Sequence, residues 1–158
     1  MYFENNNIRF LLVSVITPAY NRIEYIEETI YSLLNRTYPH IEYIVVDDGS
    51  NDGTFELLQQ FHEQGKIKLL HHEGRKNKGQ SASINLGLAA AQGKYVAILD
   101  SDDLFAPGKI EHQLRFLEHH PDVGMVYGQG IAISGQGERL YELFPRNHQE
   151  PSDPNALL

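Results

Sequence analysis

Two acidic segments carry the side chains of this chain that are best suited to chemistry. Asp47–Ser50 follows the apolar run Ile44–Val46, and Asp100–Asp103 follows the apolar run Val96–Leu99. An apolar run that ends abruptly in carboxylates is typical of a buried parallel strand whose carboxyl end opens into a ligand crevice. Carboxylates in close proximity repel one another, by about 4 kcal/mol per close pair at an effective dielectric of about 20. A divalent cation such as Mg²⁺, which prefers oxygen ligands and substrate phosphates, is therefore the expected partner.

Composition and charge exclude several classes of protein. At 158 residues, of which 41% are hydrophobic and 22% charged, the chain suits one soluble globular domain. Its 13 basic and 21 acidic residues give a net charge of −8, so we expect no nucleic-acid partner. The absence of cysteine excludes a small disulfide scaffold and thiolate chemistry. The first residues form neither a basic signal region nor a long apolar span, so we expect no transmembrane segment and a cytoplasmic location, with the inner face of the membrane left open.

The periodicity of apolar residues predicts alternating strands and helices. Strands are expected at Leu11–Thr17, Glu42–Val46, Ile67–Leu70 and Tyr95–Leu99. Helical spacing follows these strands in turn, with apolar positions spread over Ile23–Leu34, Phe55–Phe61, Ala82–Ala90 and Ile110–Leu117. We expect Pro18 and Asn21 to end the first strand in a turn, and Ser50 or Asp52 to cap the second helix.

This alternation predicts an α/β fold with a mostly parallel sheet and helices on both faces. Its ligand site would lie outside the carboxyl ends of the strands. Towards the C-terminus the pattern changes, because Ile131–Ser134 and Arg139–Leu143 flank Gly135-Gln136-Gly137, which predicts an antiparallel hairpin. We expect one domain over residues 11–145, with a flexible N-terminus at 1–10 and a flexible tail at 146–158.

Four short motifs occur in an order that resembles family 2 glycosyltransferases. The resemblance extends from about Val13 to Tyr127, and its motifs are Thr17-Pro18-Ala19-Tyr20-Asn21, Val46-Asp47-Asp48-Gly49-Ser50, Asn77-Lys78-Gly79 with Asn85 and Gly87, and Leu99-Asp100-Ser101-Asp102-Asp103. The resemblance implies a Rossmann-like fold of the GT-A type that binds a nucleotide-diphospho-sugar, such as a UDP-sugar, across the strand ends. It also implies a Mn²⁺ or Mg²⁺ ion on the diphosphate, where a metal acts as a Lewis acid.

The same resemblance implies roles for individual residues. Asp100 is expected to contact the ribose, Asp102 to coordinate the metal, and Asp103 to be the alternative metal ligand. Asp48 resembles the aspartate that accepts a hydrogen bond from uracil N3–H, and Thr17 and Tyr20 resemble residues that flank the base. The other substrate-binding residues expected at the strand ends are Pro18, Ala19, Asn21, Asp47, Lys76, Gly79 and Ser101.

Departures from the family pattern limit these expectations. Ile84 stands where family members often carry an Arg, so any contact of that Arg is absent. The family's general base resembles an Asp after a Glu, far beyond the Asp-x-Asp segment. The chain contains no Glu-Asp pair and no Trp, so we expect the base and the acceptor half to be missing and leave the catalytic residue unassigned. The parent enzyme would transfer the sugar with inversion to a glycan, lipid or cell-surface polysaccharide acceptor.

Alternatives remain open for the fold's acidic edge. The carboxylates at Asp100–Asp103 could cap the helix near Pro107, and Asp47 and Asp48 could be plain turn residues. Ile98–Asp102 also resembles the nucleophile strand of haloacid-dehalogenase-type phosphatases, although the order of segments is reversed. A non-catalytic nucleotide-sugar-binding module, dimeric through an exposed sheet edge, is the other alternative. The histidine pairs His71-His72 and His119-His120 are expected on the surface.

Overall fold

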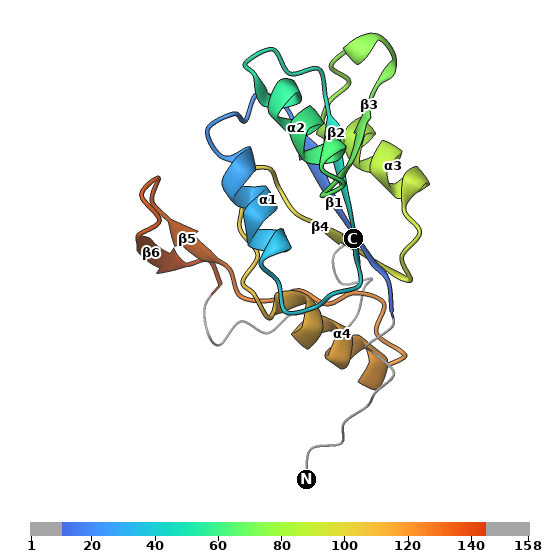
Figure 1. The fold of residues 1–158 in the computed structure, drawn as a ribbon. Coiled ribbons are helices and arrows are strands. Elements are labelled where there is room, and N and C mark those ends of the chain that lie inside the picture. The colour runs from blue at the N-terminus through green and yellow to red at the C-terminus, as the bar shows by residue number, and fades with distance from the viewer. Residues whose placement is uncertain (1–10, 145–158) are drawn as a thin grey trace, which may run out of the picture. The chain divides into compact units, whose positions relative to one another are not determined.

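The computed structural model describes residues 11–144 of the chain (Figure 1). The flexible ends predicted at 1–10 and 146–158 lie outside the described residues. The chain divides into two compact units, Met1–Pro121 and Asp122–Leu158, which we describe separately. Within the described part, no helix is both long enough and apolar enough to cross a membrane.

The first unit is built on a four-stranded sheet in which all strands are parallel. Its strands are β1 Val13–Ala19, β2 Ile41–Asp47, β3 Lys68–His71 and β4 Tyr95–Ile98, in the spatial order β3-β2-β1-β4. The prediction of a mostly parallel sheet is therefore confirmed. Successive strands step outwards from β1 to β3, and the chain then crosses back to place β4 on the other side of β1. The crevice at such a reversal is where open α/β sheets bind ligands.

Helices cover both faces of this sheet, as predicted. They are α1 Ile26–Leu34, α2 Thr54–Glu63, α3 Gln80–Ala90 and α4 Lys109–His119 (Figure 1). Ile16, Ile44 and Val46 point to one face, where Leu86 of α3 packs against them. The alternate strand residues point to the other face and pack with apolar residues of α1, α2 and α4. The strands are thus buried on both sides, which explains their continuous apolar runs.

A glycine lets α3 lie unusually close to β1. A Cβ atom at Gly87 would lie 2.5 Å from Cγ2 of the buried Ile16, closer than side chains approach one another. This close contact sets the distance between α3, which begins at Gln80, and the sheet. Because Gln80 begins the helix at the carboxyl edge, this packing also fixes one side of the crevice.

The first strand continues past the point at which the sequence predicts its end. Pro18 was expected to end the strand in a turn, which is wrong, because β1 includes Pro18 and Ala19. The backbone N–H and C=O groups of successive strand residues point in turn to the neighbouring strand on one side and on the other. The Ile16 carbonyl accepts the N–H of Leu99 on the β4 side, whereas the Ala19 carbonyl accepts the N–H of Asp48 on the β2 side. Pro18 therefore faces β4 beyond its last paired residue, where the missing N–H removes no ladder hydrogen bond.

Other element ends differ by a few residues. The N-cap position of α2 is Gly53, with φ of 101°, and not Ser50 or Asp52. Asp52 still serves the helix start, because its Oδ1 accepts the backbone N–H and the hydroxyl of Thr54. Burial alone would raise the pKa of Asp52, but these bonds and the N–H of Ile23 outweigh it and lower the pKa.

The second unit contains the predicted antiparallel hairpin. Its strands are β5 Ile131–Ile133 and β6 Arg139–Glu142. The turn between them is closed by a hydrogen bond of 2.8 Å from the Ser134 N–H to the Glu138 carbonyl, and Gly137 adopts a φ of 79°. No strand forms in the apolar stretch at 123–127 that follows Pro121. The hairpin prediction is confirmed.

A carboxylate ties α4 to the start of β4, which gives a first prediction. Oε1 of Glu118 accepts hydrogen bonds from Lys94 Nζ at 2.6 Å and from the Tyr95 hydroxyl at 2.5 Å. Lys94 and then Tyr95 lower the pKa of Glu118. Glu118→Gln is therefore expected to lower the free energy of unfolding by about 1 kcal/mol at pH 7 in urea titrations.

The pH dependence of this loss has a definite sign. A carboxyl whose pKa is lowered on folding stabilises the protein above its unfolded pKa of about 4.3 and loses that effect as the pH falls through the folded value. The difference between wild type and Glu118→Gln should accordingly shrink between pH 5 and acid unfolding. The exposed Glu63 provides a matched control, since Glu63→Gln removes the same charge from a helix end. A loss of equal size at every pH would contradict the prediction.

Candidate functional site

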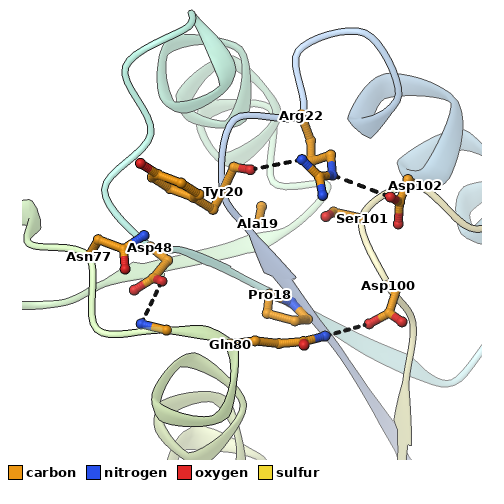
Figure 2. Close-up of a pocket in the computed structure, with 11 residues that line it drawn as sticks. Pro18, Ala19, Tyr20, Arg22, Asp48, Asn77, Gln80, Asp100, Ser101 and Asp102 are labelled. Atoms are coloured by element: carbon orange, nitrogen blue, oxygen red, sulfur yellow. Dashed lines mark hydrogen bonds and ion pairs between the residues drawn. The ribbon is translucent and has the colours of Figure 1, made fainter.

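Four loops at the carboxyl edge of the parallel sheet enclose a pocket of about 560 Å³ (Figure 2). Each loop follows one of the four strands, so residues far apart in the chain meet there. The pocket is lined by Pro18, Ala19, Tyr20, Arg22, Asp48, Asn77, Gly79, Gln80, Asp100, Ser101 and Asp102. A concave site with a few convergent polar groups is the usual form of a small-molecule site.

The loops after β1 and β2 are joined by hydrogen bonds from backbone N–H groups to side-chain oxygens. Asn21 adopts a φ of 52°, which turns the chain sharply after β1. Its N–H donates to Ser50 Oγ at 3.0 Å, and its Oδ1 accepts the N–H of Asn51 at 2.9 Å. This arrangement leaves Tyr20 at the rim of the pocket with 44% of its surface exposed. Tyr20 is thus not a core tyrosine, and its ring is available to a ligand.

The buried carboxylate of Asp47 stabilises the turn after β2 by hydrogen bonds. Its side chain is fully buried, and its carboxylate accepts the backbone N–H groups of Gly49 and Ser50 at 3.1–3.3 Å. Gly49 adopts a φ of 83°, and a Cβ there would lie 2.6 Å from the carbonyl oxygen of Arg75. The turn and the loop after β3 are therefore packed backbone to backbone. Asp47 lies outside the lining of the pocket.

Asp48 lines the pocket and holds the loop after β3. Its side chain is almost completely buried, and Oδ1 and Oδ2 accept the backbone N–H groups of Lys78 and Gly79, each at 2.8 Å. Hydrogen bonds to an ionised group are stronger than neutral ones. The carboxylate therefore fixes the backbone of the loop after β3 at the pocket wall.

The basic residues are arranged differently from the sequence expectation. Arg75 turns away from the pocket, because its guanidinium stacks 3.6 Å over the ring of Phe55 and donates to the Ser50 carbonyl. Lys76 is exposed and does not line the pocket. The cation at the pocket is Arg22, which follows β1 and whose Nε lies 3.3 Å from Oδ2 of Asp102 (Figure 2).

The acidic loop after β4 is held from three sides. Gln80 donates through Nε2 to Oδ1 of Asp100 at 3.0 Å, across the pocket from α3 (Figure 2). Arg22 pairs with Asp102. From below, the Thr29 hydroxyl of α1 donates to the Ser101 carbonyl at 3.1 Å. The loop is therefore preorganised by side chains from three other elements.

The donor chemistry of this loop suits a hard divalent cation. Burial, and then the charges of Asp100 and Asp102, raise the pKa of Asp103, so the three carboxylates repel one another. Among residues 11–144, no group of three or more His, Cys, Asp or Glu side chains is arranged to hold a metal ion by itself. A metal here would take one or two carboxylates and complete its shell with water and ligand phosphates, which is how Mg²⁺ is commonly bound.

Thr17 lies beneath the pocket and not on its wall. Its side chain is fully buried, and its Oγ1 shares a hydrogen bond of 3.1 Å with the hydroxyl of Tyr43. Burial raises the pKa of this tyrosine. In the structure, Thr17 is thus part of a buried polar pair in the core.

The structure brings together most of the residues expected from sequence. Those that line the pocket are Pro18, Ala19, Tyr20, Asp48, Gly79, Asp100, Ser101 and Asp102, and those that do not are Thr17, Asn21, Asp47, Lys76 and Asp103. Sequence reasoning missed Arg22, Asn77 and Gln80 as lining residues. Each stands within or beside a motif that was recognised, so adjacency to a motif was the available signal.

Comparison with known proteins identifies the relatives of the chain. A family model described as "Glycosyl transferase family 2" matches residues 14–153. TuaG of Bacillus subtilis (strain 168), whose name assigns it provisionally to teichuronic acid biosynthesis, is 48% identical over 107 residues, which cover 67% of this chain and 42% of TuaG. Glycosyltransferase GlyG of Streptococcus pneumoniae serotype 4 is 41% identical over 102 residues, which cover 63% of this chain and 33% of GlyG.

The chain is also similar to solved structures of sugar-transferring proteins. TarS 1-349 of S. aureus in complex with UDP-GlcNAc superimposes with a TM-score of 0.64 at 31% identity, over 70% of this chain and 32% of TarS. The mannosyltransferase PcManGT from Pyrobaculum calidifontis, in complex with GDP-Man and Mn²⁺, superimposes with a TM-score of 0.61 at 31% identity, over 68% of this chain and 32% of that protein. The chain therefore spans less than half the length of these relatives.

Proposed function

The chain belongs to glycosyl transferase family 2, and from that premise we propose that its pocket binds a nucleotide-diphospho-sugar, a UDP-sugar, together with Mn²⁺ or Mg²⁺. The observation that supports this proposal most strongly is the position of the pocket. It lies at the carboxyl edge of the sheet, where the strand order reverses around β1. One side of it holds carboxylates suited to a metal, and the other holds an exposed tyrosine and a buried aspartate suited to a base.

The proposal gives the base, the ribose and the diphosphate of the donor their partners. The base stacks on Tyr20 and donates its imide N–H to Asp48, and the ribose hydroxyls donate to Asp100. The metal is held by Asp102, with Asp103 as a second ligand. When bound, the metal neutralises charge on the departing diphosphate. Arg22 lies beside Asp102, where its guanidinium supplements this positive charge.

The descriptions of two solved neighbours support a nucleotide-sugar donor and a metal. One is described with UDP-GlcNAc and another with GDP-Man and Mn²⁺, so relatives of the same fold hold nucleotide-sugars with different bases. In this chain the residue proposed to select the base is Asp48, at the wall of the pocket.

Transfer itself is proposed for the longer protein type to which this domain corresponds. The acceptor would be a glycan, a lipid or a precursor of a cell-surface polymer, for which the name of the Bacillus subtilis relative gives support. Inversion requires a general base on the acceptor hydroxyl, and we assign this role to no residue described in the structure. The comparisons give no support to the phosphatase alternative or to a non-catalytic module.

Titration calorimetry tests the donor site. We expect UDP and UDP-glucose to bind in the presence of Mn²⁺ and to bind much more weakly after the metal is chelated. Absence of binding for UDP, UDP-glucose and GDP-mannose under both conditions would contradict the proposal. A subsequent assay for UDP release from UDP-glucose tests for turnover, and release of UDP would exclude a non-catalytic module.

A further inference from the structure

A histidine lies buried directly behind Asp48. His72 follows the last residue of β3, and only 8% of its surface is exposed, whereas its neighbour His71 is exposed. The prediction that both residues of this pair lie on the surface is therefore wrong for His72. Its Nε2 lies 3.0 Å from Oγ of the fully buried Ser83 on α3 and 3.5 Å from Oδ1 of Asp48.

The surroundings of Nε2 indicate which tautomer is present. An ionised carboxylate only accepts hydrogen bonds, so an Nε2 lone pair directed at Asp48 would be repelled. The repulsion is strong here because both side chains are buried away from water. With hydrogen on Nε2, the N–H donates to the Ser83 oxygen at 3.0 Å, and the contact of 3.5 Å with Asp48 becomes attractive. The stable arrangement therefore has hydrogen on Nε2.

Resting on the proposed function, we infer that His72 is a positioning residue that orients the Asp48 carboxylate for recognition of a uracil-type base. Two backbone N–H groups donate to this carboxylate, that of Lys78 to Oδ1 and that of Gly79 to Oδ2. His72 Nε2 lies 3.5 Å from Oδ1, an electrostatic contact longer than these hydrogen bonds. The Lys78 N–H and the imidazole thus both face Oδ1, which leaves Oδ2, with its single donor, as the acceptor for the base.

A single acceptor oxygen, Oδ2 of Asp48, suits one class of base. Uracil and thymine present a single N–H between two carbonyl groups, which a single oxygen satisfies. Guanine presents an N–H beside an amino group, and this pair of donors requires both oxygens of a carboxylate. Since Oδ1 already accepts the Lys78 N–H and faces His72, the geometry favours the single imide donor at Oδ2. His72 thereby contributes to base selection without touching the nucleotide.

The test compares two nucleotides and three variants by calorimetry with Mn²⁺. UDP carries the imide N–H, and N3-methyl-UDP lacks it. His72→Leu replaces the imidazole by an apolar side chain of similar size and so removes the donor. This variant is expected to bind UDP about tenfold more weakly. It should weaken N3-methyl-UDP by less than about twofold, because that base has no proton to donate to Asp48. His72→Gln, which restores an amide N–H near the position of Nε2, should recover most of the affinity for UDP.

Ser83→Ala removes the nearer partner of Nε2 and leaves Asp48 in place. It should leave UDP affinity within about twofold of the wild type, because the His72–Asp48 interaction remains. An equal loss for UDP and N3-methyl-UDP in His72→Leu, or a loss in Ser83→Ala as large as in His72→Leu, would show a structural role and overturn the inference. Full affinity for UDP in His72→Leu would overturn it as well.

A ligand-free measurement separates this inference from the donor proposal. The ¹⁵N chemical shifts of the His72 ring, assigned by their absence in His72→Gln, should show a protonated Nε2. A lone pair on Nε2 would overturn the inference even if the wild type binds UDP. Failure of the wild type to bind UDP would instead overturn the proposed function, and the base-selecting role with it, whatever the tautomer.

Discussion

The Asp102→Asn variant is expected to bind UDP no better with Mn²⁺ than without it. Asp102 lines the pocket at the carboxyl end of β4, and its side chain pairs with Arg22 at 3.3 Å. Asparagine keeps the shape of the side chain but removes the charge that a divalent cation needs. Even outer partners of metal ligands cost about 10- to 100-fold in affinity when replaced, so we expect a loss of at least about 100-fold for a direct ligand.

The same variant should fold normally, which makes the binding result interpretable. Asp102 and Arg22 are both about half exposed, so their ion pair contributes little, and stability should stay within about 0.5 kcal/mol. Glu63→Gln is the matched control, because it removes one negative charge from an exposed helix end away from the pocket. Metal-dependent UDP binding that persists in Asp102→Asn would exclude Asp102 as a required ligand.

The Gly49→Ala variant is expected to be destabilised by about 2 to 5 kcal/mol, measured from urea unfolding. Gly49 has a φ of 83°, which costs an alanine about 1 to 2 kcal/mol. The new Cβ would also lie 2.6 Å from the Arg75 carbonyl oxygen and 3.0 Å from the Asn77 nitrogen. Both atoms are backbone, so the loop after β3 must shift, and overpacking of this kind costs about 1 to 3 kcal/mol more.

Gly65 provides a control that separates strain from collision. It also lies in the left-handed region, with a φ of 68°, but a Cβ there meets nothing within 4 Å. Gly65→Ala should therefore show only the conformational cost, and the difference between the two variants measures the collision. Gly49→Ala should in addition weaken UDP binding, because the displaced loop carries Asn77 and Gly79 of the pocket wall. Equal destabilisation of the two variants would contradict this packing.

The sequence was sufficient to predict the arrangement of the first unit. Buried parallel strands show as short apolar runs, and amphipathic helices show as apolar residues at helical spacing, so the types and order of elements could be predicted. Their ends could not be predicted as well. Pro18 was expected to terminate β1, and the error arose because a proline is tolerated in a strand where the neighbour has already ended.

The position of the site could also be predicted, because parallel topology brings every strand's carboxyl end to one edge. The directions of individual side chains could not. Arg75 stands beside Lys76, which was expected to bind substrate, yet Arg75 stacks on Phe55, and the cation that lines the pocket is Arg22. Thr17 is turned into the core by a hydrogen bond to Tyr43, a residue 26 positions away. Such partners are set by tertiary packing and carry no signal in local sequence.

The buried position of His72 was hidden for the same reason. It stands in a polar stretch next to an exposed histidine, and that local pattern is typical of a surface loop. In the folded chain, His72 is buried because the loop after β3 packs against Ser83 of α3 and against Asp48. Buried polar groups of this kind are found from their partners, which the chain brings together only on folding.

Paramagnetic broadening by Mn²⁺ would locate the metal site residue by residue. With ¹⁵N-labelled protein saturated with UDP, small additions of Mn²⁺ should broaden the amide signals of Asp100–Asp103 first, followed by those of Tyr20–Arg22. The amides of Gly65 and Gly93, which precede β3 and β4 at the opposite edge of the sheet, should stay sharp. Broadening centred anywhere other than the carboxyl edge, or uniform broadening without a centre, would contradict a metal-dependent donor site in this pocket.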